Sequence, residues 1–131
     1  MYQLIMFVGN LGKDPEMRFT PDGQAVTSLS VATSRKFTGK DGRKVDETTW
    51  FRVSVWGKQA ESCNEYLHKG SKVLVEGRLT PDPASGGPRT FIRENGTSGA
   101  SFEVTANTVR FLSAASETAG GEVVSDEDVP F

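Results

Sequence analysis

Residues 48–56 of the chain read Thr-Thr-Trp-Phe-Arg-Val-Ser-Val-Trp, and they carry the clearest strand pattern in the sequence. Successive side chains of a β-strand point to opposite faces, so Phe51, Val53 and Val55 share one face. The other face carries two indoles, a guanidinium and a hydroxyl, from Trp50, Arg52, Ser54 and Trp56. This alternation predicts a strand with its apolar face in a core and its mixed aromatic and basic face exposed.

Further strands and one helix are expected on both sides of this stretch. The strands are expected at residues 4–8 (with 18–20 extending the pairing), 25–34, 72–79 and 101–112. A helix should follow the central strand, because apolar residues recur at spacings of three and four from Ala60 to Leu67, before Gly70. Residues 38–46 read as a polar loop, and residues 80–100, rich in proline and glycine, read as a long loop or projecting hairpin.

The order of these elements predicts an all-β fold. Three strands, one helix and two strands at regular spacing fit a five-stranded Greek-key OB-fold barrel, with the helix between strands 3 and 4. The chain has 131 residues, which is the length of one domain with a short tail. We therefore expect a single barrel domain at residues 1–112.

The composition of the chain changes at residue 113. Residues 113–125 lack aromatic side chains and cannot bury enough apolar area to offset their ordering entropy, so they are predicted to form a flexible, disordered linker. The chain ends in an acidic tip with an apolar terminus, formed by Asp126, Glu127, Asp128, Val129, Pro130 and Phe131. Without the acids of the tail, residues 1–112 carry a formal charge of +3. A mildly basic domain joined to an acidic tail points toward nucleic acid.

Several classes of protein are excluded by what the sequence lacks. One cysteine, Cys63, and one histidine, His68, allow neither an intrachain disulfide nor a structural zinc site. No phosphate-binding loop or catalytic pairing is present, so we expect no enzyme activity, no cofactor and no metal. No stretch approaches the roughly 20 apolar residues of a membrane span, and no signal-peptide pattern opens the chain. A cytoplasmic location without a membrane partner is expected.

The exposed face of the central strand allows two interpretations. In the first, Trp50 and Trp56 form a second hydrophobic layer under a loop or against another subunit. In the second, their rings are stacking platforms for bases, and Arg52 between them contacts phosphates. Residues 35–37, Arg-Lys-Phe, repeat the pattern of a cation beside an aromatic ring. Interleaved aromatic and basic residues on an exposed sheet favour single-stranded nucleic acid, whose base faces are free, over duplex.

Several stretches resemble the bacterial single-stranded DNA-binding protein family. Residues 7–15, Phe-Val-Gly-Asn-Leu-Gly-Lys-Asp-Pro, are similar to the family's opening strand and turn, and residues 126–131 are similar to its acidic tip, which ends in Pro-Phe. The stretches that match, in chain order, are residues 7–15, 30–34, 49–53, 56–61, 65–73, 75–79 and 126–131. The resemblance covers nearly all of the expected barrel domain and resumes at the tip.

The resemblance implies an OB-fold protein that binds single-stranded DNA without strong sequence preference and has no enzymatic activity. In the family, aromatic side chains at the positions that match Phe37, Trp50 and Trp56 stack on bases. Phe91 is the best candidate for a further stacking residue, in the arm after the fourth strand. The residues expected at the DNA backbone are Arg52, Lys58 and Lys69 by the resemblance, and Arg35 and Lys36 by the pattern at residues 35–37.

The resemblance also implies an assembly and partners. It predicts a homotetramer with one barrel per chain, associated with the nucleoid, whose tip docks onto replication, recombination and repair proteins. Three features depart from the family pattern. The arm after the fourth strand, where the family has its further stacking aromatic, is rich in proline and glycine here. Phe37 stands where many members carry tryptophan, which weakens stacking there. Phe51 occupies a position that is polar in some members and near the subunit interface, where an apolar ring suits a buried contact.

Two other functions stay open at this point. A single-stranded RNA chaperone could use the same barrel, because stacking and phosphate contacts discriminate little between sugars. A protein-interaction adaptor could bury the aromatic strand inside an oligomer. Through the resemblance, the acidic Pro-Phe tip favours the genome-maintenance role.

Overall fold

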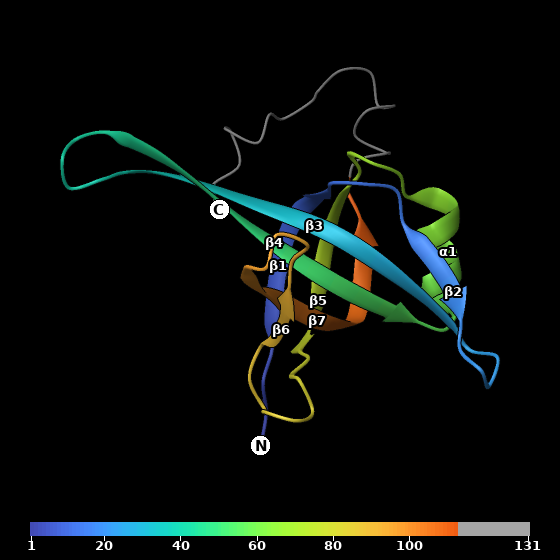
Figure 1. The fold of residues 1–131 in the computed structure, drawn as a ribbon. Coiled ribbons are helices and arrows are strands. Elements are labelled where there is room, and N and C mark those ends of the chain that lie inside the picture. The colour runs from blue at the N-terminus through green and yellow to red at the C-terminus, as the bar shows by residue number, and fades with distance from the viewer. Residues whose placement is uncertain (113–131) are drawn as a thin grey trace, which may run out of the picture.

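The computed structural model describes residues 1–112 of the chain. Within that range the chain forms seven strands and one helix (Figure 1). In chain order these are β1 (Ile5–Leu11), β2 (Glu16–Phe19), β3 (Ala25–Thr38), β4 (Lys44–Trp56), α1 (Lys58–Tyr66), β5 (Lys72–Leu79), β6 (Arg89–Ile92) and β7 (Ser98–Phe111).

Five of the strands close into a barrel. Neighbouring strands follow the order β1-β5-β7-β4-β3, and β1 pairs with β3 at Asn10↔Ala32 and Leu11↔Val31 to close the ring. The β4–β7 pairing is parallel, and the other pairings of the barrel are antiparallel. The short strands β2 and β6 pair with β3 and β7. The five-stranded OB-fold barrel predicted from the sequence is confirmed.

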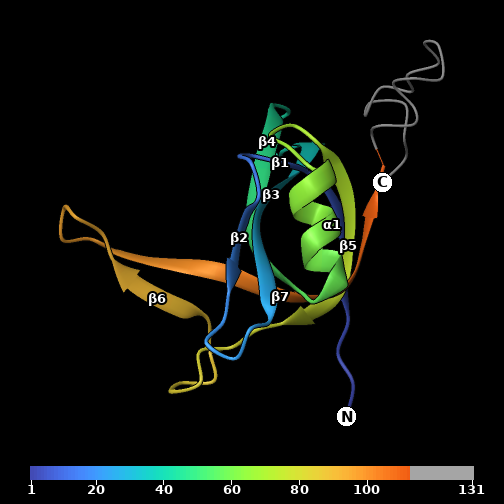
Figure 2. The same ribbon diagram turned by 90° about the vertical axis from the view of Figure 1, so that its right-hand side faces the viewer.

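The helix α1 lies between β4 and β5 and packs against the barrel (Figure 2). Ala60 and Cys63 on the inner side of α1 are buried, as is Leu67 directly after it. Burial raises the pKa of the Cys63 thiol to about 11, so the thiol stays protonated at neutral pH and serves as a small core residue. Residues 16–19 form a separate short strand, and for this reason the helix follows the fourth strand of the chain rather than the third.

The core is built from the inward faces of the five barrel strands, β1, β3, β4, β5 and β7. Val53 and Val55 of β4 are fully buried, and Val53 lies opposite the buried Leu29 of β3. The neighbouring Arg52 and Trp56 point outward and are exposed. The alternation predicted for residues 48–56 is therefore confirmed.

The hairpin of β3 and β4 is longer than predicted and projects from the barrel (Figure 1). The prediction of a polar loop at residues 38–46 is wrong, because the strands continue to Thr38 and resume at Lys44. The outermost cross-strand pairs are Arg35↔Glu47, Lys36↔Asp46, Phe37↔Val45 and Thr38↔Lys44. Two of these pairs set opposite charges across from each other, which supports strand pairing in a stretch whose composition reads as a loop.

Residues 80–100 contain a second projection, made by β6 and the beginning of β7 (Figure 2). The two segments pair from Arg89↔Ser101 to Ile92↔Ser98, and we call this hairpin the arm. Of the two alternatives that the sequence allowed for residues 80–100, a long loop or a projecting hairpin, the structure has the hairpin.

In residues 1–112, no helix has the length and apolar character needed to cross a membrane. The predicted linker at 113–125 and the predicted tip at 126–131 lie outside the described residues.

Candidate nucleic-acid interface

The outer face of β4 carries a row of aromatic and basic side chains. We call this row, formed by Trp50, Arg52, Ser54 and Trp56, the tryptophan face. The Trp50 side chain is 54% exposed and the Trp56 side chain is 44% exposed. Residues 1–112 of a single chain therefore do not bury either indole.

The β3 residues across from the tryptophan face are small or short. In order from Trp50 to Trp56 they are Ala32, Ser30, Ser28 and Val26. On the β3 side the two indoles and the Arg52 guanidinium therefore have only short neighbours, whereas on the β7 side the register partner of Arg52 is Glu103. A groove of about 210 Å³ is lined by Trp50 and Arg52, and also by Lys13 of the β1–β2 connection and Ser101 of β7. The Trp50 ring thus borders a groove whose walls carry two cations, Lys13 and Arg52, and one carboxylate, Glu16.

Lys58 adds a positive charge just beyond Trp56, at the end of the tryptophan face. It is exposed and begins α1 two residues after Trp56. Gly57 makes the turn between them with φ 74°, a backbone conformation that favours glycine. Lys69 lies in the α1–β5 connection, where its backbone N–H donates to Oδ1 of Asp14 at 2.8 Å. This bond ties the connection that carries Lys69 to the connection that carries Lys13.

The projecting part of the β3–β4 hairpin divides the predicted residues between its two faces. Residues directly opposite share a face, so Lys36, opposite Asp46, lies in register with the tryptophan face, whereas Phe37 and Arg35 lie on the other face. The Arg35 guanidinium carbon is 4.4 Å from the centre of the Phe37 ring, which is a cation–π contact. Arg35 Nε is also 3.5 Å from a carboxylate oxygen of Glu47. The structure therefore does not bring Phe37 onto the face of Trp50.

Phe91 lies on β6 of the arm, whose partner strand β7 lines the groove beside Trp50 with Ala100 and Ser101. The Phe91 side chain is 42% exposed, and the Arg93 guanidinium carbon is 5.4 Å from its ring centre. The ring covers Gly99, the residue directly opposite on β7. The arm therefore presents its own pair of an aromatic ring and a cation.

Two candidate residues were missed from the sequence, Arg93 and Lys13. Arg93 is two residues from Phe91, a spacing that puts both side chains on one face of a strand, so the sequence contained this signal. Lys13 contacts Oε1 of Glu16 at 3.5 Å and lines the groove beside Trp50. That proximity comes from long-range packing and has no local signal.

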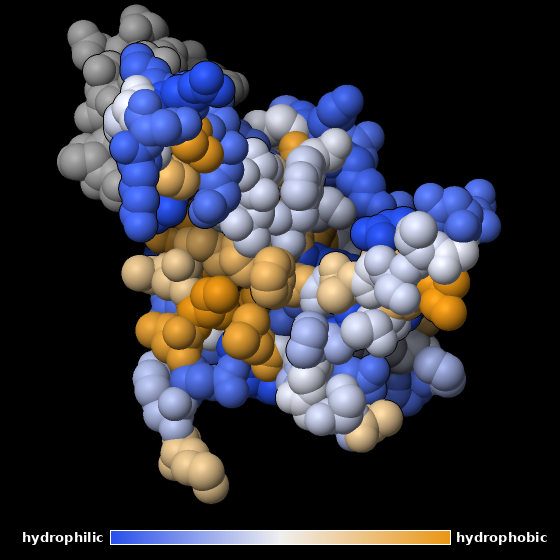
Figure 3. Space-filling view, turned by 60° about the vertical axis from the view of Figure 1, so that its left-hand side comes forward, coloured by the Kyte–Doolittle hydropathy of each residue, from blue (hydrophilic) through white to orange (hydrophobic). Residues whose placement is uncertain are grey.

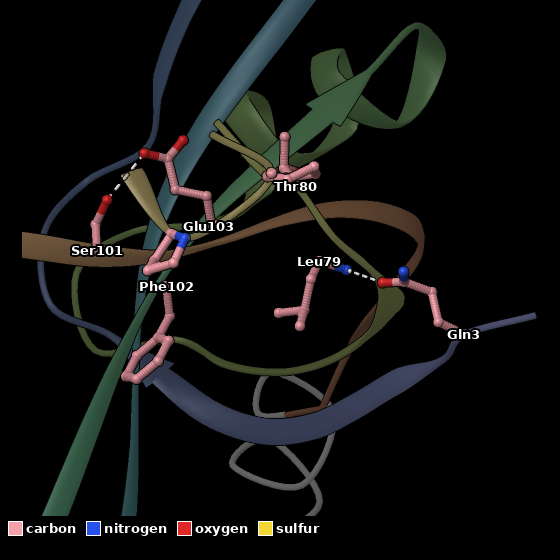
Figure 4. Close-up of a pocket in the computed structure, with 10 residues that line it drawn as sticks. Gln3, Leu79, Thr80, Ser101, Phe102 and Glu103 are labelled. Atoms are coloured by element: carbon pink, nitrogen blue, oxygen red, sulfur yellow. Dashed lines mark hydrogen bonds between the residues drawn. The ribbon is translucent and has the colours of Figure 1, made fainter. Parts of the chain in front are cut away.

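A second, more apolar pocket of about 360 Å³ lies between the N-terminal segment, the base of the arm and β7 (Figure 4). Leu79 and Phe102 line it, and both are half exposed. The backbone N–H of Leu79 donates to Oε1 of Gln3 at 3.0 Å, and Ser101 Oγ donates to Oε2 of Glu103 at 2.9 Å. Figure 3 shows hydrophobic side chains gathered near the N-terminus, below the hydrophilic β3–β4 hairpin. No local sequence pattern indicated this surface.

A model of the single-strand binding protein family matches residues 2–112. The chain belongs to this family. A single-stranded DNA-binding protein from Wolinella succinogenes is 36% identical over 121 residues, which are 92% of this chain and 70% of the relative. A protein of the same description from Neisseria meningitidis serogroup A is 33% identical over 117 residues, 89% of this chain and 63% of the relative. The chain thus spans about two thirds of the length of these relatives.

Solved structures of single-stranded DNA-binding proteins resemble the barrel. The small protein of this description from Streptomyces coelicolor matches with a TM-score of 0.68 and 25% identity, over 86% of this chain and 96% of its own. A deletion mutant of the protein from Thermus aquaticus matches with a TM-score of 0.65 and 29% identity, over 85% of this chain and 50% of its own. These likenesses confirm both the family and the fold expected from the sequence.

Proposed function

We propose that this protein binds single-stranded DNA along the tryptophan face, without strong sequence preference. The observation that carries the proposal is the order Trp50, Arg52, Trp56, in which two half-exposed indoles flank a guanidinium on an open sheet surface. Membership of the single-strand binding protein family supports the same substrate.

In this proposal stacking binds the bases and positive charge binds the phosphates. Every base has a flat π-face, so stacking on an indole, which stabilises a complex by about 1–3 kcal/mol per base, tolerates any sequence. The guanidinium of Arg52 and the ammonium of Lys58 meet the phosphates between stacked bases. In a duplex the base faces are already stacked on each other, and for this reason the single strand is the preferred form.

The proposed contacts continue onto the β3–β4 hairpin and the arm, which extend the reach of the barrel along a strand. The proposed stacking residues are Phe37, Trp50, Trp56 and Phe91. The proposed backbone contacts are Arg35, Lys36, Arg52, Lys58 and Lys69, and the structure adds Lys13 and Arg93 as candidates. Phe37 and Phe91 each already have a guanidinium near their ring, so a base stacked there has a cation beside it.

The proposed assembly is a homotetramer with one barrel per chain. Apolar side chains near the N-terminus support self-association, because Leu4, Met6 and Phe102 are 47%, 60% and 56% exposed in the single chain. Exposed apolar patches of this kind mark surfaces that contact other proteins. We propose that the tryptophan face stays outside this contact and remains open to DNA.

The proposed role is to protect single strands during replication, recombination and repair, in the cytoplasm at the nucleoid, without catalysis. In this role the tip, residues 126–131, recruits partner proteins of those pathways. Three acids next to Pro130 and Phe131 suit a partner pocket that is apolar inside and basic at its rim.

The substrate is tested by competition. A fluorescently labelled oligothymidylate is bound to the full-length protein, and unlabelled oligothymidylate, oligouridylate and duplex DNA compete for it. The proposal predicts displacement by oligothymidylate at the lowest concentration and little displacement by duplex. Stronger displacement by oligouridylate would make RNA the substrate. No binding of the labelled oligonucleotide would favour the adaptor function instead.

A further inference from the structure

Gly12 lies directly against the indole of Trp50. A Cβ atom at Gly12 would fall 2.5 Å from Cζ3 and 2.6 Å from Cη2 of that ring. Both distances are well inside the separation at which carbon atoms attract each other, about 3.5–4.0 Å. The outer edge of the indole therefore occupies the space that any side chain at position 12 would need.

The two glycines of residues 9–12, Gly-Asn-Leu-Gly, have different structural roles. A Cβ at Gly9 would collide with the backbone carbonyl oxygen of Ala32, at the point where β1 and β3 close the barrel. The obstacle at Gly12 is only the far end of a side chain. Gly12 also has no left-handed backbone conformation, and its N–H donates to the carbonyl oxygen of Ser30 at 2.9 Å, a bond that alanine can make equally well.

We infer that Gly12 is a positioning residue that holds the indole of Trp50 in its binding orientation, an inference that rests on the proposed function. One side of the ring is supported by the β1–β2 connection, while the side chain stays 54% exposed and borders the groove. A ring that is already held in place loses little freedom when a base stacks on it. A methyl group at position 12 displaces the ring and leaves the barrel unchanged.

The first test is Gly12→Ala in the full-length protein, measured by its affinity for labelled oligothymidylate. The dissociation constant should rise by about fivefold or more, since fivefold corresponds to the lower end of the loss of one base stack. Gly87→Ala is the matched control, because the backbone of Gly87 is not left-handed and a Cβ atom there would meet only Ser85 Oγ, at an ordinary contact distance of 3.7 Å. That control should bind like the unchanged protein.

The second test asks whether Gly12 acts through Trp50. Gly12→Ala is combined with Trp50→Ala, and the affinity of the double variant is compared with that of Trp50→Ala alone. The inference predicts no further loss, because the ring that the methyl group would displace is gone. An equal loss in both backgrounds would overturn the inference.

The third test does not need DNA. In a Trp56→Phe background, Trp50 is the sole tryptophan, so the emission spectrum reports on its surroundings. Adding Gly12→Ala should shift the emission maximum while the circular dichroism spectrum and the melting temperature stay within error. An unchanged emission maximum, or an unfolded Gly12→Ala chain, would contradict a purely side-chain collision.

Failure of the inference and failure of the proposed function give different results. If the unchanged protein does not bind oligothymidylate, the proposed function fails, and the emission shift still decides whether Gly12 places the ring. If the unchanged protein binds and Gly12→Ala binds equally well, only the inference fails.

Discussion

The rings of Phe7 and Phe51 lie almost parallel, with their centroids 4.2 Å apart and 13° between their planes. Phe51 stands between Trp50 and Arg52 in the chain but points to the other side of β4. The ring of Phe102 from β7 adds a third aromatic group at 5.9 Å from Phe51. This cluster joins β1, β4 and β7 directly behind the tryptophan face, so it supports the surface that is proposed to bind DNA.

Removing the Phe51 ring should therefore lower stability more than it lowers affinity. For Phe51→Ala we expect the free energy of unfolding to fall by about 2–3 kcal/mol, somewhat less than for a fully buried phenylalanine. Urea denaturation gives this value, and the affinity is measured per folded molecule. Phe111→Ala, which removes a more peripheral ring near Tyr66, should cost clearly less. Equal stability of Phe51→Ala and the unchanged protein would show that the stack contributes nothing.

Salt should weaken binding in proportion to the number of phosphates that the protein neutralises. The logarithm of the binding constant should fall linearly with the logarithm of the salt concentration, with a slope of about −0.7 per phosphate. Arg52→Ala and Lys58→Ala should each lower the affinity and reduce the slope by about 0.7. Arg110→Ala, at the far end of β7, is the control of equal charge. A slope near zero, or the same reduction for Arg110→Ala, would contradict the assigned contacts.

The contribution of Phe37 should depend on the length of the oligonucleotide. Phe37 lies on the projecting hairpin and on the opposite face from Trp50, so a short strand bound at the tryptophan face does not reach it. Phe37→Ala should leave short oligothymidylates unaffected and weaken long ones by about 1 kcal/mol, the lower end of one stack. Thr38→Ala is the neighbouring control. A loss of the same size at every length would place Phe37 at the tryptophan face instead.

The β4 sequence was enough to predict which side chains line the core and which lie outside. Val53 and Val55 alternate with Arg52 and Trp56, and a period of two is a local property that needs no knowledge of neighbouring strands. The placement of Phe37 was not predictable in the same way. Its face depends on the register and length of the hairpin, and the polar pairs near its tip read as a loop.

Contacts between distant segments were also beyond local pattern. Gly12 and Trp50 are 38 positions apart in the chain, and only the folded barrel brings them together. The same holds for Lys13 at the groove and for Gln3 at Leu79. The sequence therefore identified the types of residue at the candidate interface, whereas the contacts that hold these residues in place could be seen only in the structure.

The tip is expected to act through Phe131. Deleting Phe131 removes no side-chain charge, so a tail that serves only solubility should be unaffected. The recruitment proposal predicts that this deletion abolishes partner capture from a cell extract and leaves the DNA affinity nearly intact. Deleting residues 126–131 should also raise the DNA affinity slightly at low salt, because their acids are like-charged to DNA and screening is weakest there. Capture of the same partners without Phe131 would contradict docking through the tip.

Stacking of bases on Trp50 and Trp56 can be followed by the intrinsic fluorescence of the two indoles. The variants Trp50→Phe and Trp56→Phe each retain one tryptophan and are titrated with oligothymidylate at low salt. We predict that the emission of both variants is quenched to saturation, at the oligonucleotide concentration where an independent binding signal also saturates. Binding that reaches saturation with no quenching in either variant would show that neither indole stacks on a base, and the proposed binding mode would be wrong.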